Sequence, residues 1–117
     1  MSTHSDLGLD QKIEEIFRDI VEPVFQELTD EYNEAPGFEV KRVPDGPLIK
    51  GIERYSSIMF KHPNGVEMIV CVYWVLGSHR LFAENIRMVT LNKMFDVFSL
   101  TREELKEEVA FLAGLKL

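Results

Sequence analysis

The sequence has a single cysteine and no apolar run long enough to cross a bilayer. Cys71 has no partner for an internal disulfide, and this, together with the lack of a signal peptide, favours a reducing compartment. The longest apolar run, Met68 to Leu76, has about nine residues, roughly half of what a transmembrane helix needs. We therefore expect a soluble cytoplasmic protein that has no membrane partner.

Motifs for catalysis and for cofactor binding are also missing. The glycines are isolated, so none belongs to a phosphate-binding glycine-rich loop. His4, His62 and His79 lack the spacing of metal ligands, and no second cysteine joins them. Cys71 lies inside an apolar run, where burial raises the pKa of a thiol and favours packing over nucleophilic attack. We expect no enzymatic activity, no cofactor and no metal site.

Acidic charge is concentrated in the N-terminal part of the chain. Nine acidic residues lie between Asp10 and Glu34 against two basic ones, an excess of −7 that equals the net charge of the whole chain. From Phe38 to Phe98 the balance reverses, with eight basic residues against six acidic ones. An acidic surface repels phosphate, so no nucleic-acid partner is expected. The acidic face either keeps the protein soluble or docks a basic protein.

Residues 9–32 have the periodicity of one amphipathic helix. Its apolar residues recur at steps of three and four: Leu9, Ile13, Ile16, Phe17, Ile20, Val24, Phe25, Leu28 and Tyr32. Asp10 is predicted to be the N-cap. Pro23 lacks a backbone donor and clashes with the preceding turn, which predicts a kink or break near Val21–Glu22. Ala35-Pro36-Gly37 is expected to end the helix.

Three extended segments follow the helix. Phe38–Val43, Leu48–Lys61 and Val66–Leu76 are rich in β-favouring residues. Pro44-Asp45-Gly46 separates the first two and Pro63-Asn64-Gly65 the next two, and both triplets have the residue order of a tight turn. Two consecutive hairpins are therefore predicted.

The third of these segments, Val66–Leu76, is apolar on both of its alternating faces. Met68, Val70, Val72 and Trp74 share one face, and Ile69, Cys71, Tyr73 and Val75 share the other. A strand of this kind is central and covered on both sides. We expect the first helix to cover one face, and the last helix or another subunit to cover the other.

The chain after Gly77 is ambiguous up to the last helix. His79–Asn85 fits either a strand or a short helix, because its apolar residues match both periods. Arg87–Leu91 and Lys93–Phe98 are predicted to be extended and joined tightly at Asn92. The final helix is clearer, since a threonine and a glutamate three residues apart, at positions 101 and 104, form a capping box.

The element order indicates an α+β domain with an N-terminal amphipathic helix, a largely antiparallel, meander-like sheet of about five strands, and a C-terminal helix. Residues 9–117 are expected to form one domain, preceded by a disordered tail over residues 1–8. In architecture this order is similar to that of small acidic dimeric secretion chaperones, and to that of cystatin-like and nuclear-transport-factor-like folds. No site residue follows from that resemblance.

Five residues are candidates for binding. Tyr73 and Trp74 are adjacent on a strand and must face opposite sides, so one belongs to the core while the other lies under a helix or at an interface. His79 follows a turn and has Arg80 and Glu84 nearby, so it is the histidine with candidate partners. The simpler interpretation is that the aromatic residues are core residues and that the histidine is solvated.

The leading hypothesis is a small acidic, non-enzymatic protein-binding or adaptor domain, chaperone-like and homodimeric, with a basic protein as its partner. The alternative is a small-molecule-binding domain or a weakly marked enzyme, with a pocket between the first helix and the sheet and His79, Arg80 and Glu84 at its mouth. A third possibility is an acidic mimic of nucleic acid, directed against a basic nucleic-acid-binding protein.

Overall fold

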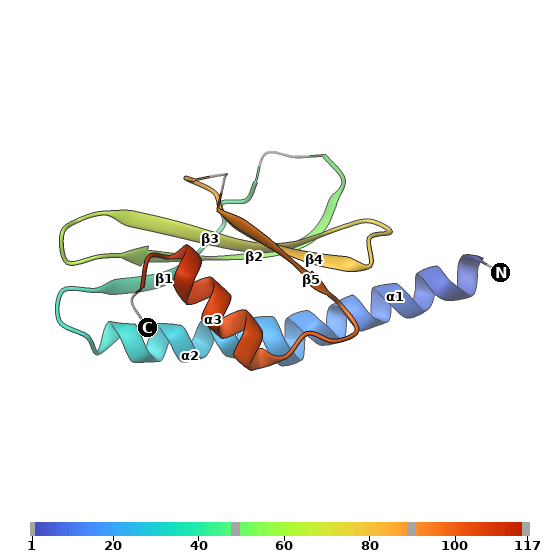
Figure 1. Ribbon diagram of the computed structural model, residues 1–117, viewed down its shortest axis with the longest axis horizontal. Coiled ribbons are helices and arrows are strands. Elements are labelled where there is room, and N and C mark those ends of the chain that lie inside the picture. Colours follow the sequence, from blue (N-terminus) through green and yellow to red (C-terminus); the bar gives the residue numbers. More distant parts are fainter. Residues whose placement is uncertain (1, 48–49, 89–90, 116–117) are drawn as a thin grey trace.

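A computed structural model describes residues 2–47, 50–88 and 91–115. It consists of one sheet with the helices packed below it (Figure 1). The elements are α1 (Ser2–Ile16), the π-helical segment η1 (Phe17–Val21), α2 (Glu22–Asn33), β1 (Glu39–Val43), β2 (Ile52–Lys61), β3 (Glu67–Val75), β4 (Arg80–Asn85), β5 (Asn92–Asp96) and α3 (Arg102–Leu112). None of the helices in the described part of the chain has the length and apolar content needed to cross a membrane.

The five strands lie side by side in chain order, and each is antiparallel to its neighbours. This confirms the predicted α+β class, and β3 is the central strand of a meander. The turn at Pro63-Asn64-Gly65 is confirmed as well. Gly65 has a φ of +89°, and the backbone N–H of His62 donates to the carbonyl of Val66 at 2.8 Å.

α1, η1 and α2 form one continuous rod along the sheet (Figure 1). Because α1 begins at Ser2, Asp10 lies inside the helix, and the predicted N-cap at Asp10 is wrong. Residues 2–8, for which a disordered tail is expected, belong to the same helix. A continuous helical hydrogen-bond ladder needs no cap at an interior position, which is why a capping residue type alone misplaces the start.

The irregularity predicted near Val21–Glu22 is a π-helical turn and not a break. In it, the N–H of Glu22 donates to the carbonyl of Phe17, five residues earlier. Pro23 has no N–H, so the carbonyl of Asp19 lacks its usual helical donor. Arg102 of α3 takes that place, because its Nε donates to the Asp19 carbonyl at 2.8 Å. The proline thus creates an acceptor that holds the start of α3 against the rod.

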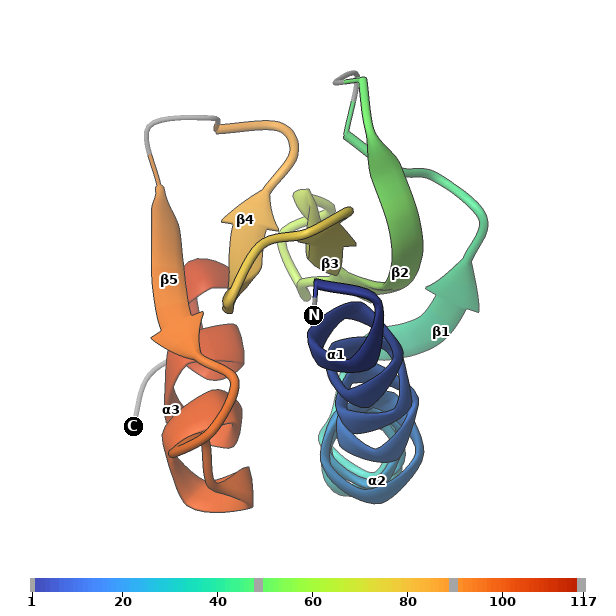
Figure 2. The ribbon, with the colours of Figure 1, turned by 90° about the vertical axis from the view of Figure 1, so that its right-hand side faces the viewer.

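Both helical parts pack on one face of the sheet, called the inner face (Figure 2). Its strand residues are Val40, Ile58, Phe60, Val70, Val72, Trp74, Leu81, Ala83 and Phe95. Phe17, Phe25 and Phe60 are fully buried between rod and sheet. These rings occupy part of the space where the small-molecule alternative places a pocket.

Of the two candidates for covering the opposite, outer face, the last helix is ruled out, and another subunit stays a prediction. α3 contacts α2, η1 and β4 on the inner side, because the chain turns directly under the sheet after β5. The apolar face of α3 therefore adds to the core that the rod already forms. Its capping box is as predicted, with the Glu104 N–H donating to the Thr101 hydroxyl.

The outer face is partly covered by the connection between β1 and β2. The Tyr55 hydroxyl donates to the Pro44 carbonyl at 2.8 Å, and the Ser57 hydroxyl donates to the Asp45 carbonyl. The predicted tight turn at Pro44-Asp45-Gly46 is wrong, because β2 begins only at Ile52 and Gly46 has no positive φ. The predicted start of this strand, at Leu48, lies outside the described residues.

The ambiguous region contains one strand before a turn. His79–Asn85 is strand β4 from Arg80 onward. Residues 86–88 form a turn, so the strand predicted over Arg87–Leu91 is wrong for this part, and residues 89–90 lie outside the described ones. The next strand, β5, begins at Asn92, where a tight connection is predicted.

Candidate functional site

Two of the predicted binding residues meet on the outer face. The Tyr73 hydroxyl lies 3.4 Å from Oε1 of Glu84, and the Tyr73 ring stacks on Phe82 with 5.3 Å between centroids. Burial, reinforced by the negative charge of Glu84, raises the pKa of Tyr73 to about 12. The phenol therefore stays protonated near neutral pH and donates to the carboxylate, which suits a structural or binding contact better than proton transfer.

The other three predicted residues lie elsewhere. Trp74 is on the inner face, 4% exposed, and its indole Nε1 donates to the Ser78 carbonyl at 2.7 Å, which fixes the β3–β4 turn. The His79 ring lies 5.9 Å from the ring of Phe98 at the end of the sheet. Arg80 is exposed at the start of β4. These five residues do not form one site.

The single thiol has no catalytic environment. Cys71 is fully buried on β3, and burial raises its pKa to about 12. A thiol in this state has almost no nucleophilic thiolate at neutral pH. Among the residues that the structure describes, no group of histidine, cysteine, aspartate and glutamate side chains could hold a metal ion.

Several acidic side chains of the helical rod form ion pairs with basic residues of the same chain. Arg42 of β1 donates to Glu22 through its two terminal guanidinium nitrogens, and these hydrogen bonds lower the pKa of the Glu22 carboxyl. Arg54 of β2 lies 3.2 Å from Glu14 and 4.4 Å from the centroid of the Phe17 ring. These sheet arginines are therefore less available for the acidic helix of a second copy.

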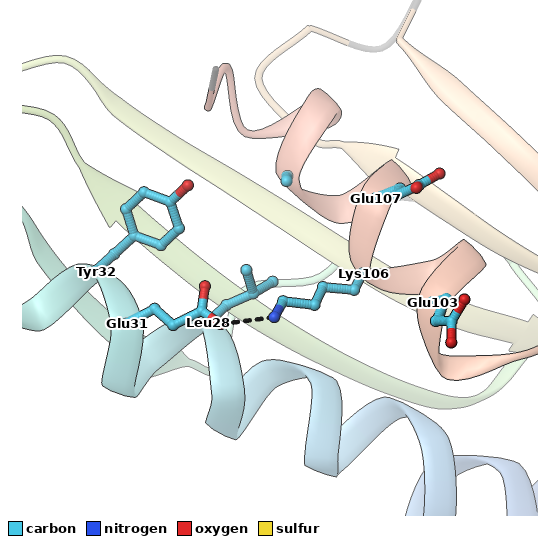
Figure 3. A pocket seen from close by; sticks show the side chains of 7 residues that line it. Leu28, Glu31, Tyr32, Glu103, Lys106 and Glu107 are labelled. Atoms are coloured by element: carbon cyan, nitrogen blue, oxygen red, sulfur yellow. Dashed lines mark hydrogen bonds and ion pairs between the residues drawn. The ribbon is translucent and has the colours of Figure 1, made fainter. Parts of the chain in front are cut away.

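A hollow lies between α2 and α3 and is called the α2–α3 groove (Figure 3). It encloses about 360 Å³ and is lined by Leu28, Glu31, Tyr32, Glu103, Lys106, Glu107 and Ala110. Its apolar lining comes from Leu28, Tyr32 and Ala110. Because Leu28 and Ala110 are each only 1% exposed, the half-buried Tyr32 supplies most of the accessible part. The remaining residues, Glu31, Glu103, Lys106 and Glu107, form a charged rim. A ligand could therefore bury apolar surface in the groove while the rim selects for the charge of the ligand.

The rim is acidic overall. Lys106 crosses the space between the helices, with its Nζ 2.6 Å from Glu31 (Figure 3). The same Nζ lies 3.4 Å from Glu27. The hydrogen bond that Lys106 donates to Glu31 is the main cause of the raised pKa of Lys106. The positive charge of Lys106 is thus compensated by these two carboxylates. Glu103 and Glu107 are exposed and have no ion-pair partner in the described part of the chain.

Sequence reasoning did not find this groove. Its two walls come from helices separated by the entire sheet, and they meet only because α3 folds back under the inner face. A weak signal exists, since Leu28 and Tyr32, like Lys106 and Ala110, are four residues apart and therefore share a helix face. Such spacing is also typical of ordinary core residues.

Comparison with protein-family models, with curated proteins and with solved structures yields no match to this chain. Inference about function therefore depends on the surface geometry and charge described above.

Proposed function

We propose that this chain is a non-enzymatic adaptor that binds a basic amphipathic segment of another protein in the α2–α3 groove. The observation that carries the proposal is the combination of an apolar floor with a rim whose acidic residues outnumber its one lysine. A leucine-sized side chain that is fully buried against Tyr32 and the aliphatic stem of Lys106 would contribute at most about 1.5–3 kcal/mol. Each exposed rim pair would add roughly 0.2–1 kcal/mol, so the apolar anchor dominates affinity while charge selects the partner.

The first test uses a synthetic lysine-rich amphipathic helical peptide, with binding followed by fluorescence anisotropy. The double substitution Glu31→Lys/Glu103→Lys reverses the rim and is expected to weaken binding about tenfold or more. The control Asp10→Lys/Glu15→Lys makes the same charge change on α1, outside the groove, and is expected to weaken binding less than about threefold. Equal losses in both variants, or no binding by the wild-type protein, would contradict the proposal.

A second candidate is small-molecule binding in the same groove. Its volume of about 360 Å³ falls within the range of ligand pockets, and its floor is apolar. A ligand bound to the folded state raises the melting temperature by mass action. A thermal shift with an uncharged ligand, combined with no binding of the basic peptide, would favour this alternative.

The homodimer is proposed to form at the sheet end that carries Leu76 and Phe98, each 62% exposed. The turns that carry them are held together, because the Val97 N–H donates to the His79 carbonyl at 3.2 Å. Light scattering coupled to size exclusion is expected to give the mass of two chains for the wild type and of one chain for Leu76→Ser/Phe98→Ser. Phe111→Ser removes an equally exposed phenylalanine from α3 and is expected to leave the dimer intact. A monomeric wild type would contradict this part of the proposal.

A further inference from the structure

The two edges of the sheet differ in how their backbone groups are satisfied. At β1, the N–H of Val40 donates to Oδ1 of Asn33 at 2.8 Å, and Nδ2 of Asn33 donates to the Val40 carbonyl at 3.0 Å. The side chain of Asn33 thus occupies one of the positions on β1 that an added strand would use. A strand added at this edge would have to displace that amide, which makes the β1 edge less available.

At β5, the opposite edge, the backbone of Met94 points away from the sheet. The N–H of Asn85 donates to the Leu91 carbonyl at 3.0 Å, and the N–H of Val97 donates to the His79 carbonyl at 3.2 Å. Hydrogen-bonded positions alternate along an antiparallel strand, so Lys93 and Phe95 face β4 and Met94 faces outward. Within the described ranges no group bonds to the backbone N–H or carbonyl of Met94.

This edge is accessible and is bordered by a hollow. β5 is the outermost strand at its side of the sheet, with α3 next to it on the inner side (Figure 2). A hollow of about 330 Å³ is lined by Lys93, Met94, Phe95, Asp96, Glu104, Glu107 and Glu108. The Met94 side chain is exposed, at 51%. An extended segment can therefore reach the open backbone groups without displacing any part of the described chain.

The charged side chains around the β5 edge determine which kind of segment can bind there. The hollow carries four carboxylates, from Asp96, Glu104, Glu107 and Glu108, against the single ammonium of Lys93. A second copy paired through β5 would bring the same carboxylates from both chains together, which is unfavourable. A segment rich in lysine or arginine would be attracted instead. The surroundings of the edge thus favour a basic partner over self-pairing.

We propose that the β5 edge binds an extended basic segment of a partner protein by β-strand addition, pairing with the backbone of Met94. Neighbouring residues on adjacent strands share a face, so the partner residue opposite Met94 points to the outer side and its two neighbours point to the inner side, toward α3. The segment recognised therefore alternates basic, apolar, basic. This site is separate from the α2–α3 groove, although Glu107 lines both hollows.

The experiment titrates the intact protein with a synthetic peptide of alternating lysine and valine and follows binding by fluorescence anisotropy. Met94→Pro removes the outward N–H at an edge position that tolerates proline, and at least a tenfold loss of affinity is expected. Met94→Leu keeps the backbone donor and is expected to stay within about twofold of the wild type. A peptide that is N-methylated at the central valine tests the same pairing on unaltered protein and should also bind at least tenfold more weakly.

The groove variant Glu31→Lys/Glu103→Lys separates this site from the proposed adaptor site, because it leaves β5 unchanged. Retained binding of the alternating peptide by that variant supports an independent edge site. Equal binding of the methylated and unmethylated peptides would overturn strand addition. The absence of any binding by the wild-type protein up to about 1 mM peptide would also overturn strand addition. Loss of a wild-type dimer in Met94→Pro, with no peptide binding, would show that β5 pairs with a second copy instead.

Discussion

At pH 8, Cys71 of the native protein is expected to react with an aromatic disulfide reagent at least about a thousandfold more slowly than Cys71 of the unfolded chain. The thiolate is the reacting species, and burial raises the pKa of Cys71 from its ordinary 9.0 to about 12. That difference alone lowers the thiolate fraction about a thousandfold. Full burial on the central strand restricts access further. Release of the coloured thiolate is measured with and without denaturant.

Cys71→Ala gives the background for this measurement, because no other thiol is present. Native and unfolded rates within tenfold of each other would show that β3 is not shielded on both faces.

The raised pKa of Cys71 also makes the stability of the folded protein depend on pH. The folded state holds the thiol proton more tightly, so this contribution is complete below about pH 9 and is lost as the pH rises toward 12. Cys71→Ala should show a smaller alkaline loss in the free energy of unfolding.

Replacing Asn85 with alanine is expected to lower the free energy of unfolding by about 3 kcal/mol. Asn85 is fully buried at the end of β4, and its Nδ2 donates to the carbonyl of Leu112 at 2.8 Å. Its Oδ1 accepts from the backbone N–H groups of Arg87 at 3.0 Å and Met88 at 3.2 Å. Removing the side chain leaves the Leu112 carbonyl and the Arg87 N–H without these bonds and loosens the end of α3, whereas the Met88 N–H keeps its bond to the Asn85 carbonyl at 3.0 Å. Urea unfolding followed by the fluorescence of Trp74 measures the effect.

Asn64→Ala is the matched control. The Asn64 side chain also accepts from a backbone N–H, that of Val66 at 3.0 Å, but on an exposed turn where water replaces it. A loss of less than about 1 kcal/mol is expected there. A similarly small loss for Asn85→Ala would mean that Asn85 does not join α3 to the turn after β4. A changed slope of the unfolding curve would point to an altered denatured state instead.

Local patterns were sufficient where the chemistry involves near neighbours. The capping box of Thr101 and Glu104 needs only three residues of separation, and Gly65 is required by the backbone of its own turn. The predicted central position of β3 is confirmed, since apolar residues on both alternating faces leave few other places for a strand. The fold class follows from these elements and their order.

Predictions failed where a local segment is held by residues that are distant in the sequence. Pro44-Asp45-Gly46 has the composition of a tight turn, yet the chain there continues across the outer face and is held by Tyr55 and Ser57. Of the kink or break predicted near Val21–Glu22, the structure has a π-helical turn that keeps the rod continuous, and Arg102 donates to the carbonyl of Asp19. Neither partner is visible within a short window of sequence.

The amino-acid order alone determined the fold class, the order of most helices and strands and the concentration of acidic charge, because periodicity, turn residues and charge are properties of adjacent positions. It did not decide between strand and helix for His79–Asn85, which the structure shows to be strand β4 from Arg80 onward. Tertiary packing decided which face α3 covers, that Arg42 and Arg54 neutralise part of the rod, and that α2 and α3 enclose a groove. It also decided that Asn33 occupies the outward backbone groups of Val40 on one edge of the sheet, while those of Met94 stay open on the other. These features depend on contacts between residues far apart in the chain, whose geometry exists only once the core has formed.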